Sequence, residues 1–301
     1  MLPSAPFLVD ECMNLLVSNL KGSMDRAGKQ QDEVGERVCV CVRVCLCMPV
    51  CRREVRHLNP PSKVEQLQKA LIACISVVFE SAADLAQKAE AFDYLVDSIK
   101  KEKDGEKARL LLKALKPQLL YLLSLSSSKD YSVPLIDSLL SIVSISSRSA
   151  RLSVQSLLHL VLTHDNALSL LHHPSSSPSS SDSETAVQLR TSLFKLLTYS
   201  ANEPDNISAI MKNLSCLLAA FREREVGHSL PLLFGLQEIA NDCGHSNLAR
   251  SIHTAIGSYL FSIARMFSSR ALHDYVLQTM ERRKKENQVC ARRCASCACV
   301  S

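Results

Sequence analysis

Apolar residues recur along this chain with the period of α-helices. The clearest case is the stretch 207–221, whose apolar residues fall at spacings of three and four and therefore share one stripe of a helix. Comparable stripes follow one another between residues 62 and 286, and they predict about ten or eleven helices. The stripe of 207–221 comprises Ile207, Ile210, Met211, Leu214, Leu217, Leu218 and Phe221.

Capping residues and prolines mark the predicted helix ends. Ser62 and Glu65 have the spacing of a capping box. Pro117 is suited to opening a new helix, and Ser269 to capping the last one. The segment "HHPSSSPSSSDSE" at 172–184 has the composition of a flexible loop.

The order of these elements predicts an all-α architecture. Helices pair at a period of roughly 40 residues, which is typical of an α-solenoid of HEAT or armadillo type. One pair cannot bury its apolar stripe alone, so each stacks on the next; a compact helical bundle is the alternative. We expect three parts: a poorly ordered segment at 1–61 with a cysteine-rich run, a helical-repeat domain at 62–286, and a disordered cysteine-containing tail at 287–301.

Composition supports this class. Apolar residues make up 47% of the chain, and there are only 8 glycines and no tryptophan. The net charge of +5 suits contact with an acidic membrane surface or an acidic partner, but no basic stripe interleaved with aromatics predicts nucleic-acid binding. The start lacks the features of a signal peptide, and no apolar run reaches the ~20 residues that span a bilayer. We therefore expect a soluble intracellular protein.

Motifs that carry catalysis are missing from the sequence. It contains no H-E-x-x-H, no G-x-S-x-G and no P-loop, so we expect no enzyme, cofactor or metal. The pair His164 and Asp165 is interpreted as a break between helices. His172 and His173 adjoin the serine-rich loop, and no further metal ligands are indicated for them.

The remaining histidines and the aromatic residues fit a structural role. His159 and His253 lie near helical stripes and are expected to be partly buried and hydrogen-bonded. His273 and Asp274 are neighbours on a helix, so their side chains are expected to diverge. Core packing is the expected role of the sparse aromatics Phe221, Phe234, Tyr259, Phe261, Phe267 and Tyr275.

The run "ERRKKE" at 281–286 is the main candidate contact surface. It contains Arg282, Arg283, Lys284 and Lys285 and ends the last predicted helix. One interpretation is that these cations favour the macrodipole at the helix C-terminus. The other is contact with a phosphate or an acidic partner. The serines of 172–184 either accept phosphate and switch a partner contact or form a spacer.

Four stretches resemble one family of membrane scaffolds. "YLFSIARMFSSRALHDYVLQTMERRKKE" at 259–286 is similar to the C-terminal part of the helical rod of the eighty-five-requiring-three, or rolling blackout, family. The stretches 149–170, 196–207 and 235–260 are also similar to parts of that family, and they occur in the same order along the chain. The resemblance covers roughly residues 62–286.

The resemblance implies a non-catalytic rod of HEAT or armadillo-like repeats, peripheral on the cytosolic face of the plasma membrane. Such a rod recruits the phosphatidylinositol 4-kinase alpha complex through tetratricopeptide-repeat and hyccin partners, and so supports phosphatidylinositol 4-phosphate there. The family's N-terminal half, which carries its palmitoylated cysteines, has no expected counterpart here; without that anchor the chain would be cytosolic. Alternatives are another HEAT or armadillo adaptor in trafficking or transport, and a lipid hydrolase.

The stretch "VCVCVRVCLCMPVC" at 38–51 has four interpretations. Its C-x-C and C-x₃-C spacings differ from the C-x₂-C pairs typical of zinc sites, and disulfides are rare in the cytosol. S-palmitoylation fits the apolar neighbours and the basic residues that follow. The cysteines in question are Cys39, Cys41, Cys45, Cys47 and Cys51.

The sequence favours the fourth interpretation, because a GTGTGT repeat in DNA encodes alternating valine and cysteine. We hypothesise that this stretch and the similar tail "CARRCASCAC" are exon-boundary or gene-model accidents. A spliced message that retains codons 30–62 in frame would remove the hypothesis.

Overall fold

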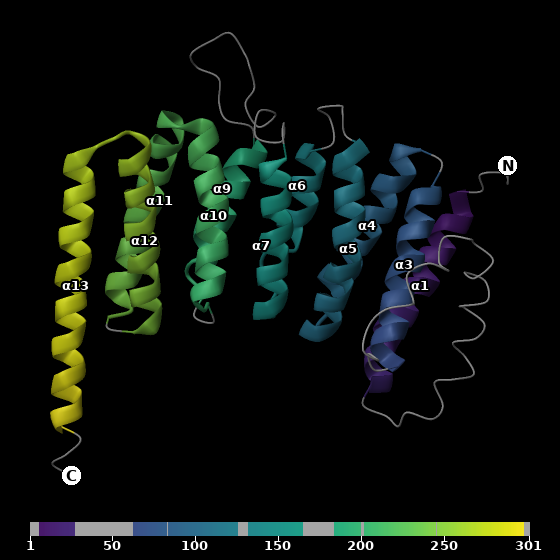
Figure 1. Cartoon of the computed structure of the whole chain (residues 1–301), viewed down its shortest axis with the longest axis horizontal. Coiled ribbons are helices and arrows are strands. Elements are labelled where there is room, and N and C mark those ends of the chain that lie inside the picture. The colour runs from purple at the N-terminus through teal and green to yellow at the C-terminus, as the bar shows by residue number, and fades with distance from the viewer. Residues whose placement is uncertain are drawn as a thin grey trace, which may run out of the picture. The chain divides into compact units, whose positions relative to one another are not determined.

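The computed structural model describes seven stretches of the chain, which together contain eleven helices and no strand (Figure 1). The stretches are 6–27, 63–82, 84–125, 132–164, 184–199, 202–244 and 246–297. The helices are α1 (Pro6–Ala27), α3 (Lys63–Ser81), α4 (Leu85–Lys101), α5 (Gly105–Leu125), α6 (Ser132–Ser141), α7 (Arg148–Thr163), α9 (Glu184–Leu196), α10 (Pro204–Phe221), α11 (Glu223–Asp242), α12 (Asn247–Met266) and α13 (Arg270–Cys297). The all-α prediction is confirmed for these stretches.

The chain divides into two compact units, residues 1–157 and 158–301, and α7 spans the division. In the first unit α1 packs mainly on α3, α4 packs on α5, and α6 packs on α4. In the second unit each helix from α9 to α12 packs on the helix that follows it, and α10 also packs on α12. Each helix therefore covers its apolar stripe with its near neighbours in sequence, as helical repeats do.

The helix α1 lies within the segment 1–61, which was predicted to be poorly ordered. Met13, Leu16, Val17 and Leu20 are buried, and their spacing of three and four places them on one stripe. The α1 side chains also make polar contacts with α4, because the Tyr94 hydroxyl donates to the Asn14 side chain and Lys21 pairs with Glu102 at 3.4 Å. The packing of this stripe against α3 explains the helix.

A second difference concerns Pro117, which was expected to start a new helix. α5 instead runs without a break through Pro117 from Gly105 to Leu125. The buried stripe continues on both sides of the proline, with Leu111 and Leu115 before it and Leu119 and Leu122 after it. Burial of these leucines outweighs the cost of about 3 kcal/mol for a proline inside a helix.

The end of α3 is held by a buried lysine from α4. Lys88 is only 7% exposed, and its ammonium group donates to the carbonyls of Ala82 and Glu80. The same group lies 5.9 Å from the centre of the Tyr121 ring on α5. A cation at the carbonyl end of a helix complements its dipole, so Lys88 joins three consecutive helices.

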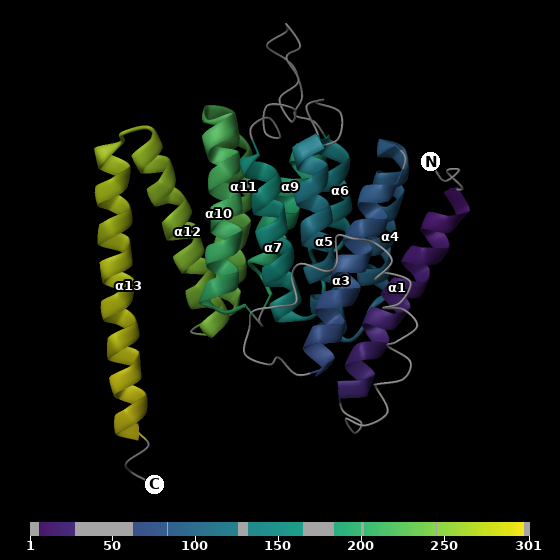
Figure 2. The ribbon, with the colours of Figure 1, turned by 45° about the vertical axis from the view of Figure 1, so that its right-hand side comes forward.

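The connection between α10 and α11 consists of one residue. Arg222 has φ 49° and ψ −117°, a backbone conformation that residues with a side chain rarely adopt. This turn lets the two helices pack on each other directly, and both also pack on α12. In Figures 1 and 2, α12 and α13 lie side by side at the end of the second unit.

The last helix is longer than predicted. α13 continues to Cys297, beyond Glu286, the predicted end of this helix. Residues 287–297 contain neither glycine nor proline to stop a helix. The division into 1–61, 62–286 and 287–301 stays a prediction.

The glycines give a test of packing in the first unit. A Cβ atom at Gly105 would lie 2.6 Å from Cβ of Ser147, which is fixed to the backbone and cannot rotate away. We expect Gly105→Ala to lower the free energy of unfolding by about 1–3 kcal/mol, measured by urea denaturation. Gly235→Ala in α11 is the control, because no atom of the described residues lies within 4 Å of its added Cβ; it should raise stability by about 0.5–1 kcal/mol. Equal effects would contradict the close contact.

Candidate functional site

Part of the predicted site lies outside the described residues. This holds for Asp165 of the pair His164 and Asp165, for the loop 172–184 apart from Glu184, which starts α9, and for the cysteine run. The predicted capping residue Ser62 also lies outside them. The cysteines concerned are Cys39, Cys41, Cys45, Cys47 and Cys51. Within the described stretches no cluster of three or more His, Cys, Asp or Glu could hold a metal ion, and no helix is long and apolar enough to cross a membrane.

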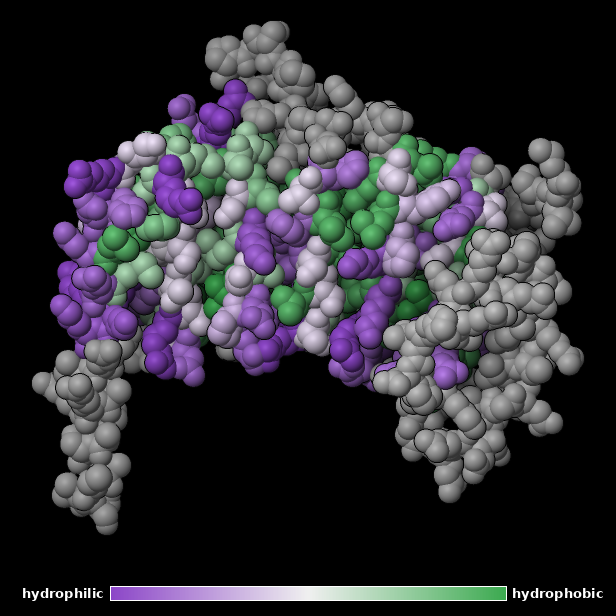
Figure 3. Space-filling model, viewed as in Figure 1, coloured by the Kyte–Doolittle hydropathy of each residue, from purple (hydrophilic) through white to green (hydrophobic). Residues whose placement is uncertain are grey.

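The basic run lies in the middle of α13. Arg282, Lys284 and Lys285 are exposed and Arg283 is half-buried, and hydrophilic side chains cover most of the described part of α13 (Figure 3). Because the helix continues to Cys297, Lys285 stands about three turns before its end. The dipole attraction falls off within the last turn, so the macrodipole interpretation is wrong for these residues.

Arg283 lies close to a histidine of the neighbouring helix. Burial and, second, the charge of Arg283 lower the pKa of His253 on α12. The Nδ1 atom of His253 is buried and makes no hydrogen bond to any described residue. The expectation that His253 is hydrogen-bonded is therefore not met at this nitrogen. Arg283 is thus part of the α12–α13 contact, whereas its three basic neighbours face outward.

One histidine lies beside a thiol, as in a cysteine hydrolase. His159 Nδ1 lies 3.2 Å from Asn213 Oδ1 and 3.7 Å from Cys216 Sγ, so His159 is partly buried and hydrogen-bonded as predicted. Both partners approach the same ring nitrogen, whereas a catalytic triad uses one nitrogen for the nucleophile and the other for the orienting group. Burial also raises the pKa of the Cys216 thiol. This arrangement favours packing of α7 on α10 and does not activate a nucleophile.

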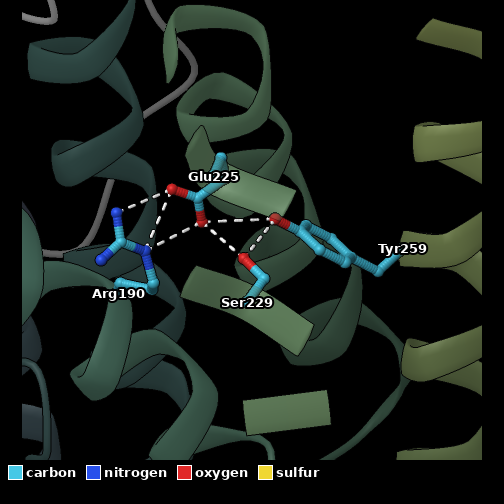
Figure 4. A network of polar contacts seen from close by, with 4 residues as sticks. All are labelled: Arg190, Glu225, Ser229 and Tyr259. Carbon is cyan, nitrogen blue, oxygen red and sulfur yellow. Dashed lines mark hydrogen bonds and ion pairs between the residues drawn. The ribbon is translucent and has the colours of Figure 1, made fainter. Parts of the chain in front are cut away.

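The strongest polar cluster is a buried network of four side chains from three helices (Figure 4). Arg190 of α9 donates from Nε and Nη2 to both oxygens of Glu225 at 2.9–3.1 Å. Ser229 Oγ donates to Glu225 Oε1 at 2.7 Å and lies 2.8 Å from the Tyr259 hydroxyl of α12. Arg190 is 3% exposed, Tyr259 1%, and the two α11 residues 0%.

The network is arranged to neutralise a charge, and it leaves no group free to react. Glu225 Oε1 also accepts from the Tyr259 hydroxyl at 3.3 Å, so each carboxylate oxygen has partners. Burial and, second, the Glu225 charge raise the pKa of Tyr259, which keeps the phenol protonated as a donor. The ring of Tyr259 packs edge-on against Phe194, with centroids 5.8 Å apart. The four residues fix α9, α11 and α12 to one another.

This network was not predicted, although the sequence contains a signal for it. Glu225 and Ser229 extend the buried stripe of α11 that continues through Leu233 and Leu236. A glutamate on an apolar stripe indicates a buried, paired charge. The partner Arg190 lies on another helix, so one sequence does not identify it.

The predictions for the other aromatics and for His273 have mixed outcomes. Phe221 is 4% exposed, as expected for the core, but Phe234 is 63%, Tyr275 60% and Phe267 38% exposed, so core packing is wrong for these three. His273 Nδ1 lies 3.3 Å from Asp274 Oδ1, so the prediction that these neighbours do not pair is also wrong. Both side chains stand at the surface in the first turns of α13, where they are free to lean together. The His273 ring also packs against the Phe261 ring, with centroids 4.9 Å apart and the ring planes tilted by 40°.

The fold defines the class of protein as an all-helical repeat, with polar clusters that serve packing. Comparison with known families makes this specific. The chain matches the model described as "EFR3, armadillo repeat" over residues 11–298, and it belongs to this family. The match confirms the predicted family and armadillo-type repeat, and it extends beyond the expected 62–286 at both ends. The chain has no significant match among curated proteins or solved structures.

The network predicts a large loss of stability on removal of its charge. Glu225→Gln keeps the shape of the side chain but removes the negative charge that neutralises the buried Arg190 guanidinium. We expect the free energy of unfolding to fall by about 3–5 kcal/mol, measured by chemical denaturation. The control is Glu106→Gln, which breaks the exposed Glu106–Arg109 pair at 2.5 Å and should cost less than about 1 kcal/mol.

Tyr259→Phe gives a second readout of the same network. The native phenol has a raised pKa, so above pH ~10, where unfolded tyrosines ionise, the native state binds more protons than the unfolded state. Stability should then fall with rising pH, and Tyr259→Phe should remove this part of the alkaline loss. An unchanged pH profile together with a small effect of Glu225→Gln would show that the network does not stabilise the fold.

Proposed function

We propose that this chain is a non-catalytic scaffold that helps to recruit the phosphatidylinositol 4-kinase alpha complex to the plasma membrane and so supports phosphatidylinositol 4-phosphate there. The observation that carries the proposal is the EFR3 match over residues 11–298. The partners are the tetratricopeptide-repeat and hyccin-type subunits of that complex, as the resemblance implies. The packing role of the polar clusters around Glu225 and Cys216 is in keeping with a scaffold.

The basic face of α13 is the proposed partner or phosphate contact. Arg282, Lys284 and Lys285 are exposed, and they form no ion pair with any described residue. Their charges are therefore not used within the described fold. Mid-helix cations of this kind suit an acidic surface on a protein or a phosphate group. Arg283 is a poorer candidate, because it faces His253.

Attachment to the cytosolic face of the membrane is the second part of the proposal. The cysteine run 38–51 is followed by basic residues, and two or more acyl chains are enough for stable anchoring next to an acidic lipid surface. Acyl exchange labels acylated cysteines and tests this directly on the wild-type chain and on a variant with all five cysteines changed to serine. Loss of the label in the variant supports acylation of the run, and an unchanged label contradicts it. The residues concerned are Cys39, Cys41, Cys45, Cys47 and Cys51.

Co-precipitation with the kinase-complex subunits tests the proposed function. The full chain should retain purified tetratricopeptide-repeat and hyccin-type subunits. The triple variant Arg282→Glu, Lys284→Glu, Lys285→Glu should weaken retention by about tenfold or more, because it places like charges against an acidic partner. The matched control is Lys100→Glu, Lys101→Glu, Lys103→Glu, which reverses three exposed charges at the α4–α5 junction and should leave retention unchanged.

The outcomes separate the alternatives. A wild-type chain that retains neither subunit would be an armadillo adaptor with other partners, and the proposed function would be lost. Retention that survives the α13 triple variant would keep the function and move the contact to another surface. Equal loss in both triple variants would indicate non-specific charge attraction, which rising salt should abolish.

A further inference from the structure

One face of α11 carries apolar residues that nothing in the described structure covers. Phe234 is 63% exposed and Leu230 37% exposed, and Pro231 and Gly227 beside them are exposed as well. Gly227 and Phe234 are seven residues apart, about two turns, and so lie on one line along the helix. The opposite face of α11 holds Glu225 and Ser229 and is buried.

Gly227 and Pro231 both weaken this helix without any gain in packing within the described residues. No described atom lies within 4 Å of a Cβ atom built on Gly227. No close approach among the described residues therefore requires the glycine, which costs about 0.5–1 kcal/mol relative to alanine. Pro231 lacks the N–H that would bond to the carbonyl of Gly227. The result is an open notch at Gly227, two turns from a projecting phenyl ring at Phe234.

A second line on the same face carries opposite charges at its two ends. Arg224, Pro231 and Glu238 are each seven residues apart. Arg224 and Glu238 are exposed, and neither forms an ion pair with a described residue. The face therefore has a notch and a cation towards its N-terminal end, and a projecting ring and an anion towards its C-terminal end.

We propose that this face binds a second copy of the chain, with the two α11 helices antiparallel about a two-fold axis near Pro231. In this arrangement Phe234 of each copy enters the notch at Gly227 of the other, because the midpoint between these two positions lies within half a residue of Pro231. Arg224 of each copy then meets Glu238 of the other along the second line. An isologous contact must be self-complementary in this way.

Charge and shape favour a second copy over an unrelated partner. An unrelated partner would need only one half of the face: either the Phe234 ring with Glu238 beside it, or the notch at Gly227 with Arg224 beside it. Here both halves stand on one helix, at three to four residues from Pro231 for the notch and the ring and at seven residues for the two charges, and antiparallel pairing uses both. The inference goes beyond the proposed function and does not depend on it, since it concerns self-association and not the kinase complex.

Sedimentation equilibrium of the full chain across the micromolar range is the test. We expect a monomer–dimer equilibrium for the wild type. Gly227→Leu fills the notch and Phe234→Ser removes the ring, and each should abolish the dimer; both positions are exposed, and circular dichroism should show the native fold. Tyr275→Ser, at a side chain of 60% exposure on α13, is the matched control and should leave the dimer unchanged.

Charge exchange identifies the pairing. Arg224→Glu alone and Glu238→Arg alone place like charges opposite each other and should each weaken the dimer by about tenfold. The double variant restores opposite charges and should recover it. A wild-type chain that stays monomeric throughout would overturn the proposal. So would a dimer that Phe234→Ser leaves intact, or single charge variants that the double variant does not rescue.

Discussion

Every helix in the described part of this chain has an apolar stripe that it cannot cover by itself, and the rest of the structure depends on this constraint. α1 covers its stripe on α3, and α12 buries Ile252, Ala255 and Tyr259 among its neighbours. Burial of a large apolar side chain such as Ile252 is worth about 1.5–3 kcal/mol. Stability is therefore spread over many local contacts, which leaves the outward surfaces available for binding.

The constraint explains what the sequence could predict. The helix α10 could be predicted because its apolar residues recur at helical spacing. Five of the seven predicted residues are buried, as the pattern requires: Ile210, Leu214, Leu217, Leu218 and Phe221. The continuous helix through Pro117 was not predicted, because proline has a low helix propensity. Packing of the leucines on both sides of Pro117 outweighs this low propensity. The network around Glu225 escaped prediction for a different reason: its partners are brought together by the packing of α9, α11 and α12, which no local pattern specifies.

The charged residues serve opposite purposes according to burial. Arg190 and Glu225 have left water completely, and each is compensated by the other; such a pair fixes the positions of helices more than it adds stability. Arg282, Lys284 and Lys285 remain in water and have no counter-charge among the described residues. In the sequence Arg190 and the three basic residues of α13 look alike, because all are basic residues in predicted helices. Only the position on the buried or the exposed face of the helix distinguishes a structural charge from a candidate contact surface.

The single-residue connection at Arg222 has a consequence for how this protein tolerates change in length. Both flanking helices begin or end directly beside it, and both are packed on α12. The connection contains no loop that could absorb an inserted residue. An insertion would therefore rotate one helix by roughly 100° relative to its packing partners. Natural insertions and fused tags should therefore be excluded from this corner, and α10 with α11 should be inherited as one unit of fixed length.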